Sequence, residues 1–272
     1  MPVPTILVVE HQATCPPGWV GEWLTDAGAR LRVARPYAVS AAGPSQSPAG
    51  SPAGSPTGPP AGSPAGSPEL LPRDLRGYDG LVVLGGTMSS GDDQTVPWLE
   101  PTKALLRVAA ATGVPTLGIC LGHQLAAVAL GGVVESNPHG KTTGLREVAW
   151  DPSTAPGDAL VGGLAGTEPT SVAIQWNNDI VTHAPPGSIP LATNERGELL
   201  AARFAPTVWG VQVHPEAHAG IVSAWADKDR ACAAAQGIDV DAALAEIRAR
   251  EATLRHTWSG VVARFAQLCR AA

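Results

Sequence analysis

Three residues in two short segments have side chains that together can cleave an amide bond. Cys120 lies in the middle of residues 118–122 (GICLG), and His214 and Glu216 lie in residues 213–216 (VHPE). A thiolate attacks the carbonyl carbon of an amide, and a neighbouring imidazole takes up the thiol proton and later donates it to the leaving amine. A nearby carboxylate can fix the orientation and tautomer of that ring. We therefore predict Cys120 as nucleophile, His214 as base and Glu216 as the residue that orients His214.

The sequence around Cys120 favours this assignment. Residues 115–119 predict a buried strand, residues 121–130 have a helical composition, and a glycine lies two residues from Cys120 on either side. A strand, a sharp turn and a helix in this order present a nucleophile at the edge of a sheet. The start of the helix stabilises a thiolate, and the N–H of Leu121 can donate to an oxyanion. The alternative is a buried structural cysteine at a strand end.

The segment before His214, residues 208–213, has a second apolar strand pattern. Sites in parallel sheets gather at the carboxyl ends of strands, so we expect His214 and Cys120 at one edge of the sheet. The histidines that compete for the role of base are His11, His123, His139, His183, His218 and His256. Of these, His123 lies three residues beyond Cys120 and stays an alternative on pattern alone.

A pair of glycines, Gly85 and Gly86, follows a third apolar run at residues 80–84. Backbone N–H groups at such a turn can stabilise an oxyanion, and losing one such donor raises a barrier by about 3 kcal/mol. For a glycine pair considered alone, a simple tight turn is the more common explanation.

The composition excludes several classes of protein. The net charge is −6 and there is no block of lysine or arginine, which argues against a nucleic-acid or anionic-membrane partner. No apolar run reaches the length of about 18 residues that would indicate a membrane span. Four cysteines lie far apart without a CxxC pair, and residues 1–10 indicate a strand instead of a signal peptide. We therefore expect a cytoplasmic protein with free thiols, and no metal or organic cofactor.

The order of predicted elements indicates the fold class. Strands alternate with helices, which is typical of an α/β domain with a mostly parallel sheet and helices on both faces. We expect one domain over residues 1–272, with a helical extension at 219–272 packed on it. Strands are predicted at 5–10, 30–35, 80–84, 115–119, 146–150, 171–175, 199–204 and 208–213, and helices at 20–29, 97–112, 121–130 and in the tail.

Residues 41–69 differ from the rest of the chain. They are built from Ser, Pro, Ala and Gly, and the motif AGSP repeats every four residues. Such a segment cannot bury enough surface to offset its conformational entropy, so we predict a disordered loop insertion. A Pro-rich ligand is the alternative, but the repeat lacks a basic or aromatic anchor.

Taken together, these segments resemble the class I glutamine amidotransferases, and more closely the stand-alone proteins similar to the amidotransferase domain of GMP synthetase. The residues that carry the resemblance are 85–89 (GGTMS), 97–99 (PWL), 114–124 (VPTLGICLGHQ), 131–132 (GG) and 211–216 (VQVHPE).

The resemblance implies a flavodoxin-like three-layer sandwich and a catalytic triad of Cys120, His214 and Glu216. It also implies an oxyanion hole from the N–H groups of Gly86 and Leu121. Substrate-binding residues follow from it as well, namely Gln124 and Trp176.

Two positions depart from the family pattern. Thr87 stands where members usually carry Pro, and Asn177 stands where many carry His. The second departure lies in a segment that usually lines the glutamine pocket, so it bears on the preference for free glutamine.

The function implied by the resemblance is hydrolysis of a γ-carboxamide in a small-molecule substrate through a Cys thioester, with release of ammonia. No phosphate-binding GxxxxGK[ST] loop or ATP-pyrophosphatase-like stretch is present, so a synthetase that accepts the ammonia would be a partner in trans. One alternative is a γ-glutamyl amide or peptide hydrolase without a partner, and another is a non-catalytic binding module. A chaperone or deglycase of a related fold is a further alternative, against which the His-Pro-Glu segment argues.

Overall fold

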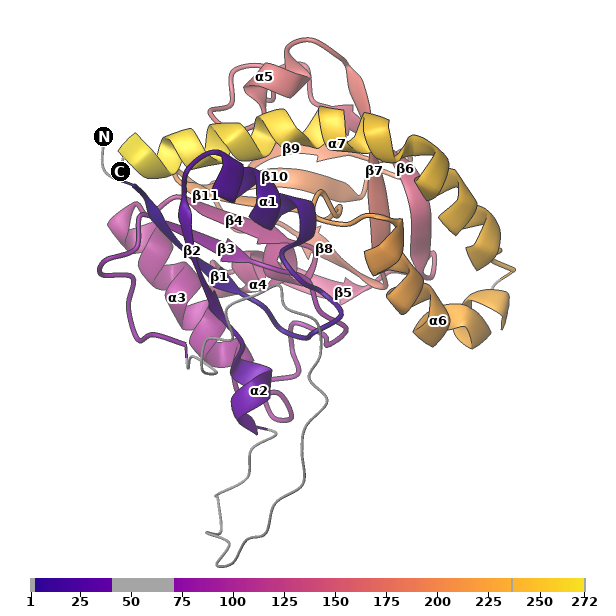
Figure 1. Ribbon diagram of the computed structural model, residues 1–272, viewed down its shortest axis with the longest axis horizontal. Coiled ribbons are helices and arrows are strands. Elements are labelled where there is room, and N and C mark those ends of the chain that lie inside the picture. The colour runs from indigo at the N-terminus through magenta and orange to yellow at the C-terminus, as the bar shows by residue number, and fades with distance from the viewer. Residues whose placement is uncertain (1–2, 41–70, 236, 272) are drawn as a thin grey trace, which may run out of the picture.

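A central sheet with helices on both faces forms the framework of the molecule, shown by a computed structural model that describes residues 3–40, 71–235 and 237–271 (Figure 1). The strands are β1 (Thr5–Val9), β2 (Arg30–Ala34), β3 (Gly80–Val83), β4 (Thr116–Ile119), β5 (Val133–Ser136), β6 (Thr142–Trp150), β7 (Thr170–Asn177), β8 (Asp179–His183), β9 (Ile189–Thr193), β10 (Leu199–Ala205) and β11 (Val208–Val211). The helices are α1 (Gly18–Asp26), α2 (Pro36–Ser40), α3 (Leu99–Thr112), α4 (Leu121–Ala129), α5 (Gly162–Ala165), α6 (Ala219–Ala235) and α7 (Val240–Ala271).

The large sheet has a parallel part and an antiparallel part. Its strand order within the described ranges is β2-β1-β3-β4-β11-β10-β9-β6-β7. The strands β2, β1, β3, β4 and β11 run parallel to one another. From β11 onward, each pair of neighbours (β11 and β10, β10 and β9, β9 and β6, β6 and β7) is antiparallel. β5 and β8 form a separate antiparallel pair. The predicted α/β fold class is confirmed, and the antiparallel part is an addition to it.

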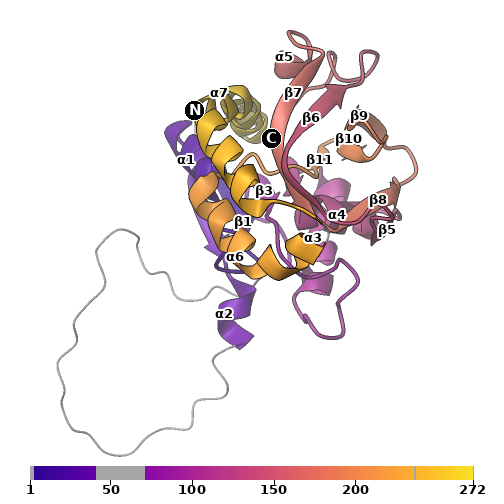
Figure 2. The same ribbon diagram turned by 90° about the vertical axis from the view of Figure 1, so that its right-hand side faces the viewer.

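Apolar side chains on both faces of the parallel strands explain the layers. In β1, Ile6 and Val8 belong to one hydrophobic core, and Leu7 and Val9 belong to the other. A strand covered on both faces needs such a continuous apolar run. Helices α1, α6 and α7 cover the first face, and α3 and α4 cover the second (Figure 2).

The long helix α7 packs on elements at both the parallel and the antiparallel part of the large sheet. It packs on α1 at one end of its path and on α5, β6 and β7 further along. Its apolar residues recur every three or four positions, which gives the helix one buried face. The side chains on that face are Leu244, Ile247, Leu254, Trp258, Val261 and Phe265, with Leu268 partly buried.

Several short elements differ from the sequence-based expectation. The strands β5, β8 and β9 and the short helices α2 and α5 were not predicted, and β6 starts four residues earlier than the predicted 146. Antiparallel strands of this kind are stabilised by cross-strand partners and need no apolar run of their own. The predicted insertion at 41–69 lies outside the described residues. Among the described helices, none combines the length and apolarity needed to cross a bilayer; the cytoplasmic location stays a prediction.

Candidate active site

Two neighbouring parallel strands bring the predicted nucleophile and base to one edge of the sheet. β4 and β11 are paired so that Ile119 lies opposite Val211. The backbone N–H of Cys120 donates to the carbonyl oxygen of Val211 at 2.8 Å. The chain therefore leaves both strands at the same level. Cys120 follows β4 directly, and His214 follows β11 after two residues.

The turn at Cys120 is strained and tightly packed. Cys120 has φ 50° and ψ −105°, and among the described residues it is the non-glycine residue with a positive φ. A Cβ atom on Gly118 would lie 2.4 Å from the carbonyl oxygen of Gly122, and one on Gly122 would lie 2.0 Å from that of Val83. Both flanking glycines are therefore required by close backbone approach. Strain of this kind is typical of a nucleophile on a strand-to-helix turn.

His214 and Glu216 form a buried pair beside this turn. The imidazole Nδ1 lies 2.7 Å from Oε1 of Glu216, and the two side chains are 3% and 1% exposed. A Cβ atom built on Gly85 would lie 3.3 Å from Cε1 of His214 and 3.6 Å from Cβ of Cys120. The imidazole and the thiol therefore border the same small space next to Gly85. Nε2 of His214 has no hydrogen-bond partner among the described atoms, which leaves it available for a substrate proton.

The charges around His214 decide its protonation. Burial lowers the pKa of this imidazole, but the negative charges of Glu216 and Cys120 and the hydrogen bond to Glu216 outweigh burial, so the pKa lies well above 6.5. The imidazolium form is therefore favoured at neutral pH, and an imidazolium stabilises a neighbouring thiolate.

Helix α6 supplies a residue that holds the imidazole in place. The ring of Trp225 lies 4.6 Å from the ring of His214, with a tilt of 50°. Its Nε1–H donates to the carbonyl oxygen of Thr14 at 2.7 Å, which ties α6 to the loop after β1. Trp225 was not predicted as a site residue, because a tryptophan in a helical stretch carries no sign of the loop it contacts.

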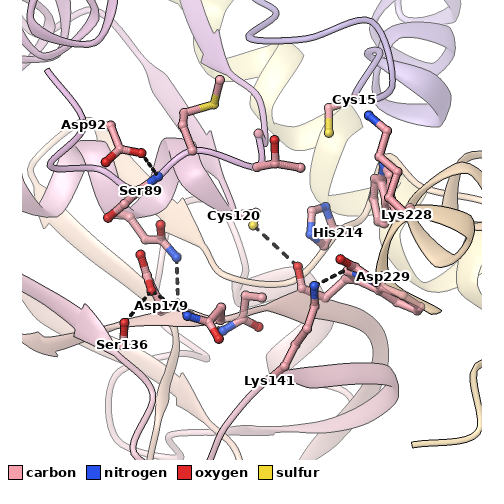
Figure 3. A pocket seen from close by; sticks show the side chains of 18 residues that line it. Cys15, Ser89, Asp92, Cys120, Ser136, Lys141, Asp179, His214, Lys228 and Asp229 are labelled. Atoms are coloured by element: carbon pink, nitrogen blue, oxygen red, sulfur yellow. Dashed lines mark hydrogen bonds and ion pairs between the residues drawn. The ribbon is translucent and has the colours of Figure 1, made fainter. Parts of the chain in front are cut away.

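A cavity of about 470 Å³ opens at Cys120 (Figure 3). Its size lies within the range of about 300–1,000 Å³ that is usual for small-molecule sites. Glu216 lies behind His214 and does not line the cavity. The lining residues are Cys15, Gly86, Thr87, Met88, Ser89, Asp92, Cys120, Gln124, Ser136, Lys141, Trp176, Asn177, Asn178, Asp179, His214, Trp225, Lys228 and Asp229.

Two of these lining residues were predicted as substrate contacts, Gln124 and Trp176. Nε2 of Gln124 donates to the carbonyl oxygen of Asp179 at 2.8 Å and to Oε1 of Gln212 at 3.2 Å, which fixes the amide. The indole Nε1–H of Trp176 donates to Oδ2 of Asp229 at 2.6 Å. The carbonyl oxygen of Trp176 lies 4.0 Å from Sγ of Cys120, so its backbone borders the thiol.

The predicted oxyanion donors lie next to each other. A Cβ atom on Gly86 would lie 2.9 Å from Cδ2 of Leu121, so Gly86 lies close to the side chain of Leu121. Leu121 is the first residue of α4, and the first N–H groups of a helix have no acceptor within it. The neighbouring Thr87, at a position that departs from the family pattern, donates through its N–H and its hydroxyl to Oε1 of Gln12 at 3.1 and 2.8 Å. This contact holds the loop after β3.

The competing histidine His123 does not lie in the cavity. It is fully buried, its ring lies 5.0 Å from that of Phe204, and burial lowers its pKa to about 4. His11 is also fully buried and accepts a hydrogen bond from Nε1 of Trp98 at 3.2 Å. Of the histidines in the sequence, only His214 lines the cavity among the described residues.

Other charged or reactive residues of the cavity were not predicted. Burial, together with the charges of Glu216 and Cys120, raises the pKa of the Cys15 thiol to about 12, so this cysteine stays protonated. Lys141 forms an ion pair with Asp229. Lys228 lies one residue before Asp229 on α6 and is exposed. Within the described part of the chain, no three His, Cys, Asp or Glu residues are grouped as a metal site would require.

More than half of the chain matches a known protein family. The family profile described as Glutamine amidotransferase class-I matches residues 66–223. This range includes Cys120, His214 and Glu216. It ends before Trp225, Lys228 and Asp229.

Curated relatives match part of the chain. One subunit of a glutamine-hydrolysing GMP synthase from Sulfolobus acidocaldarius is 33% identical over 148 residues, which are 53% of this chain and 70% of that protein. Gamma-glutamyl peptidase 5 from Arabidopsis thaliana is 31% identical over 148 residues, 53% of this chain and 56% of the peptidase. A GMP synthase from Pyrobaculum aerophilum is 37% identical over 106 residues, 38% of this chain and 19% of the synthase. The chain thus spans less than two thirds of the length of the last two relatives.

Solved structures share the fold over nearly the whole chain. A glutamine amidotransferase from Thermotoga maritima superimposes with a TM-score of 0.76 at 19% identity, covering 98% of this chain and 100% of the other. One from Methylobacillus flagellatus has a TM-score of 0.76 at 24% identity, covering 98% and 96%. The expected flavodoxin-like sandwich is therefore the fold of this chain.

Proposed function

The chain belongs to the class-I glutamine amidotransferase family, and on that premise we propose that it hydrolyses a γ-carboxamide such as that of glutamine through a thioester on Cys120. The observation that carries the proposal is the buried pair of His214 and Glu216, 2.7 Å apart, whose imidazole borders the same space as Cys120. In this proposal the three residues form a catalytic triad.

The first half of the reaction forms the thioester. The thiolate of Cys120 adds to the carbonyl carbon of the γ-carboxamide, and the carbonyl oxygen becomes an oxyanion. The imidazolium of His214 then donates its Nε2 proton to the amide nitrogen, the C–N bond breaks and ammonia leaves. The pKa of His214 supports its role as acid, because the charges of Glu216 and Cys120 raise this pKa well above 6.5 in spite of burial.

The second half releases the acid product. Neutral His214 takes a proton from a water molecule, and the water oxygen adds to the thioester carbon. The C–S bond breaks, glutamate leaves, and the thiolate of Cys120 and the imidazolium are restored. Glu216 stays ionised throughout and holds the ring through Nδ1.

We assign the oxyanion to the backbone N–H groups of Gly86 and Leu121. The side chain of Leu121 lies 2.9 Å from where a Cβ atom on Gly86 would be, and Leu121 starts the helix whose positive dipole end faces the turn. Gln124 and the segment from Trp176 to Asp179 then border the acyl part of the substrate, since both line the cavity.

Two versions of this function differ in the use of the released amine. Relatives named as subunits of a glutamine-hydrolysing GMP synthase support a version in which a synthetase partner in trans uses the ammonia. The relative named gamma-glutamyl peptidase 5 supports a hydrolase that acts on γ-glutamyl compounds without a partner. The cavity residues on α6, namely Trp225, Lys228 and Asp229, lie beyond the shared region and favour the second version.

The test is glutamate and ammonia release from glutamine by the purified chain, compared with Cys120→Ala. The proposal expects turnover by the wild type and a rate at background in C120A. Cys269→Ala is the matched control, because Cys269 is a buried free thiol that packs against Gly80, away from the cavity. Release of glutamate by C120A at the wild-type rate contradicts the proposal. Binding of glutamine without any release of glutamate identifies a binding module instead.

A further inference from the structure

The direction of bond cleavage divides the cavity into an acyl side and a leaving-group side. A general acid must reach the leaving nitrogen within hydrogen-bond distance, so the leaving group lies on the His214 side of Cys120. In Figure 3, Asp92, Ser89, Ser136 and Asp179 lie on one side of Cys120, and His214, Cys15, Lys228 and Asp229 lie on the other. A leaving group on the His214 side would therefore lie next to the second group.

Helix α6 builds much of the leaving-group side. Trp225, Lys228 and Asp229 all line the cavity, and their spacing of three and four residues places them on one face of the helix. The contacts of Trp225 with His214 and Thr14 fix this face relative to the imidazole. All three residues lie beyond residue 223, where the shared family region ends.

Within the described ranges, the charges on this face leave one cation without a partner. Asp229 accepts hydrogen bonds from Trp176 and from Lys141, so its charge is compensated. Arg230 pairs with Asp227 and Asp241, outside the cavity. Lys228 makes no hydrogen bond or ion pair with any other described residue, although it lies at the cavity wall. A flexible ammonium group at this place is suited to an anion of the ligand.

We infer that the preferred substrates are γ-glutamyl amides whose leaving amine carries a carboxylate, as in γ-glutamyl amino acids, and that Lys228 binds this carboxylate. The inference rests on the proposed function and names its substrate class. In an amino acid a single carbon separates the nitrogen from the carboxylate, so a nitrogen beside His214 would place the carboxylate on the side of the cavity that Trp225 and Lys228 line. Ammonia would leave this side of the cavity unused.

The experiment compares two substrates that differ by the carboxylate alone, γ-glutamylglycine and γ-glutamyl methylamide. The readout is the ratio of kcat/KM for the two, measured by glutamate release with the full chain. The wild type is expected to prefer γ-glutamylglycine, and Lys228→Gln is expected to lower the ratio about tenfold or more through a higher KM, because a hydrogen bond to a charged group is lost. Lys228→Arg is expected to restore much of the ratio.

The matched control is Arg230→Gln, which removes the same charge from the same helix outside the cavity. Its ratio is expected to equal that of the wild type. A fall of the ratio in R230Q as large as in K228Q would mean a long-range effect of charge and would overturn the inference. An unchanged ratio in K228Q overturns it as well, since Lys228 then contacts the glutamyl part or no part of the substrate.

A failure of the proposed function is recognised separately. If the wild type hydrolyses glutamine and neither γ-glutamyl compound, the inference is wrong and the proposed function stands. If no compound is hydrolysed, the proposed function fails, and calorimetric binding of the two γ-glutamyl compounds to C120A decides the inference. Tighter binding of γ-glutamylglycine that disappears in C120A/K228Q supports it, and equal binding of both compounds overturns it.

Discussion

Ile119 and Val211 lie opposite each other on β4 and β11, two neighbouring parallel strands near the middle of the large sheet. Cys120 follows Ile119 directly, and His214 follows Val211 after two residues. The strand pairing, with its hydrogen bond from Cys120 to Val211, therefore sets the height of the predicted nucleophile and the predicted base together. Side chains positioned from adjacent strands hold their geometry better than side chains positioned from loops.

The charge of Glu216 is predicted to control the reactivity of Cys120. Glu216→Gln removes the charge that helps to raise the pKa of His214 against burial, so the imidazolium is lost at a lower pH. We expect the hydrolysis rate to fall by roughly 10²–10⁴-fold. We also expect alkylation of Cys120 by iodoacetamide to slow at neutral pH and to need more alkaline solution. Glu22→Gln, at an exposed carboxylate paired with Arg255, is the control and should leave both rates unchanged.

Gly122 is predicted to be intolerant of a methyl group. In Gly122→Ala the Cβ atom would lie 2.0 Å from the carbonyl oxygen of Val83, so α4 and β3 must move apart. Urea unfolding should show a loss of stability of about 2–3 kcal/mol, toward the upper end of the usual cost of overpacking. Gly91→Ala is the control, because nothing lies within 4 Å of its Cβ position, and it should change stability by less than about 0.5 kcal/mol. Equal stability of the two variants would contradict the tight approach at the turn.

The backbone of Cys120 is predicted to store strain. Glycine, which has no Cβ atom, adopts φ 50° and ψ −105° at a lower energetic cost than any other residue. Cys120→Gly should therefore be more stable than Cys120→Ala by about 1–2 kcal/mol, although both variants lack the thiol. Denaturant unfolding of the two variants measures this difference. An alanine variant as stable as the glycine variant would show that the turn is relaxed.

His123 is predicted to make the fold sensitive to acid. Burial lowers its pKa from 6.5 to about 4, so between these pH values the unfolded chain binds the proton and the folded chain does not. The contribution to stability is therefore complete above about pH 6.5 and is lost as the pH falls toward 4, with a loss of roughly 2 kcal/mol at pH 5.

The variant His123→Gln isolates this contribution. The fall in unfolding free energy between pH 7.5 and pH 5 should be smaller in H123Q than in the wild type by roughly 2 kcal/mol, while all other titrating groups contribute equally to both. His256→Gln, at an exposed histidine, should keep the wild-type difference. A pH dependence in H123Q that matches the wild type would contradict the assignment.

The local signals around Cys120 explain why the sequence alone predicted much of the fold and the candidate site. Gly118 and Gly122 are needed by contacts within one turn and with the adjacent strand, and the apolar runs before Cys120 and His214 mark buried strands. The predicted α/β sandwich is confirmed, since long apolar strands covered on both faces leave few other arrangements. The roles of the predicted site residues stay predictions.

The residues of α6 could not be predicted, because their place depends on contacts between distant parts of the chain. Trp225 reaches Thr14 across 211 positions of sequence, and Asp229 accepts from Trp176 across 53. An amphipathic helix shows which of its faces is buried, but not which loop lies against it. The exclusion of His123 as base likewise needed the structure, since its packing against Phe204 leaves no trace in the local pattern.

The position of β11 between β4 and β10 has a consequence for synthesis on the ribosome. The parallel strands β1 to β4 and the antiparallel strands β6, β7, β9 and β10 are translated first, yet the large sheet stays open between them until residues 208–211 have emerged. A nascent chain thus carries two unfinished edges, each a template for wrong pairing. The last strand to appear closes the gap, so a chain whose synthesis stalls before it would contain Cys120 but not His214.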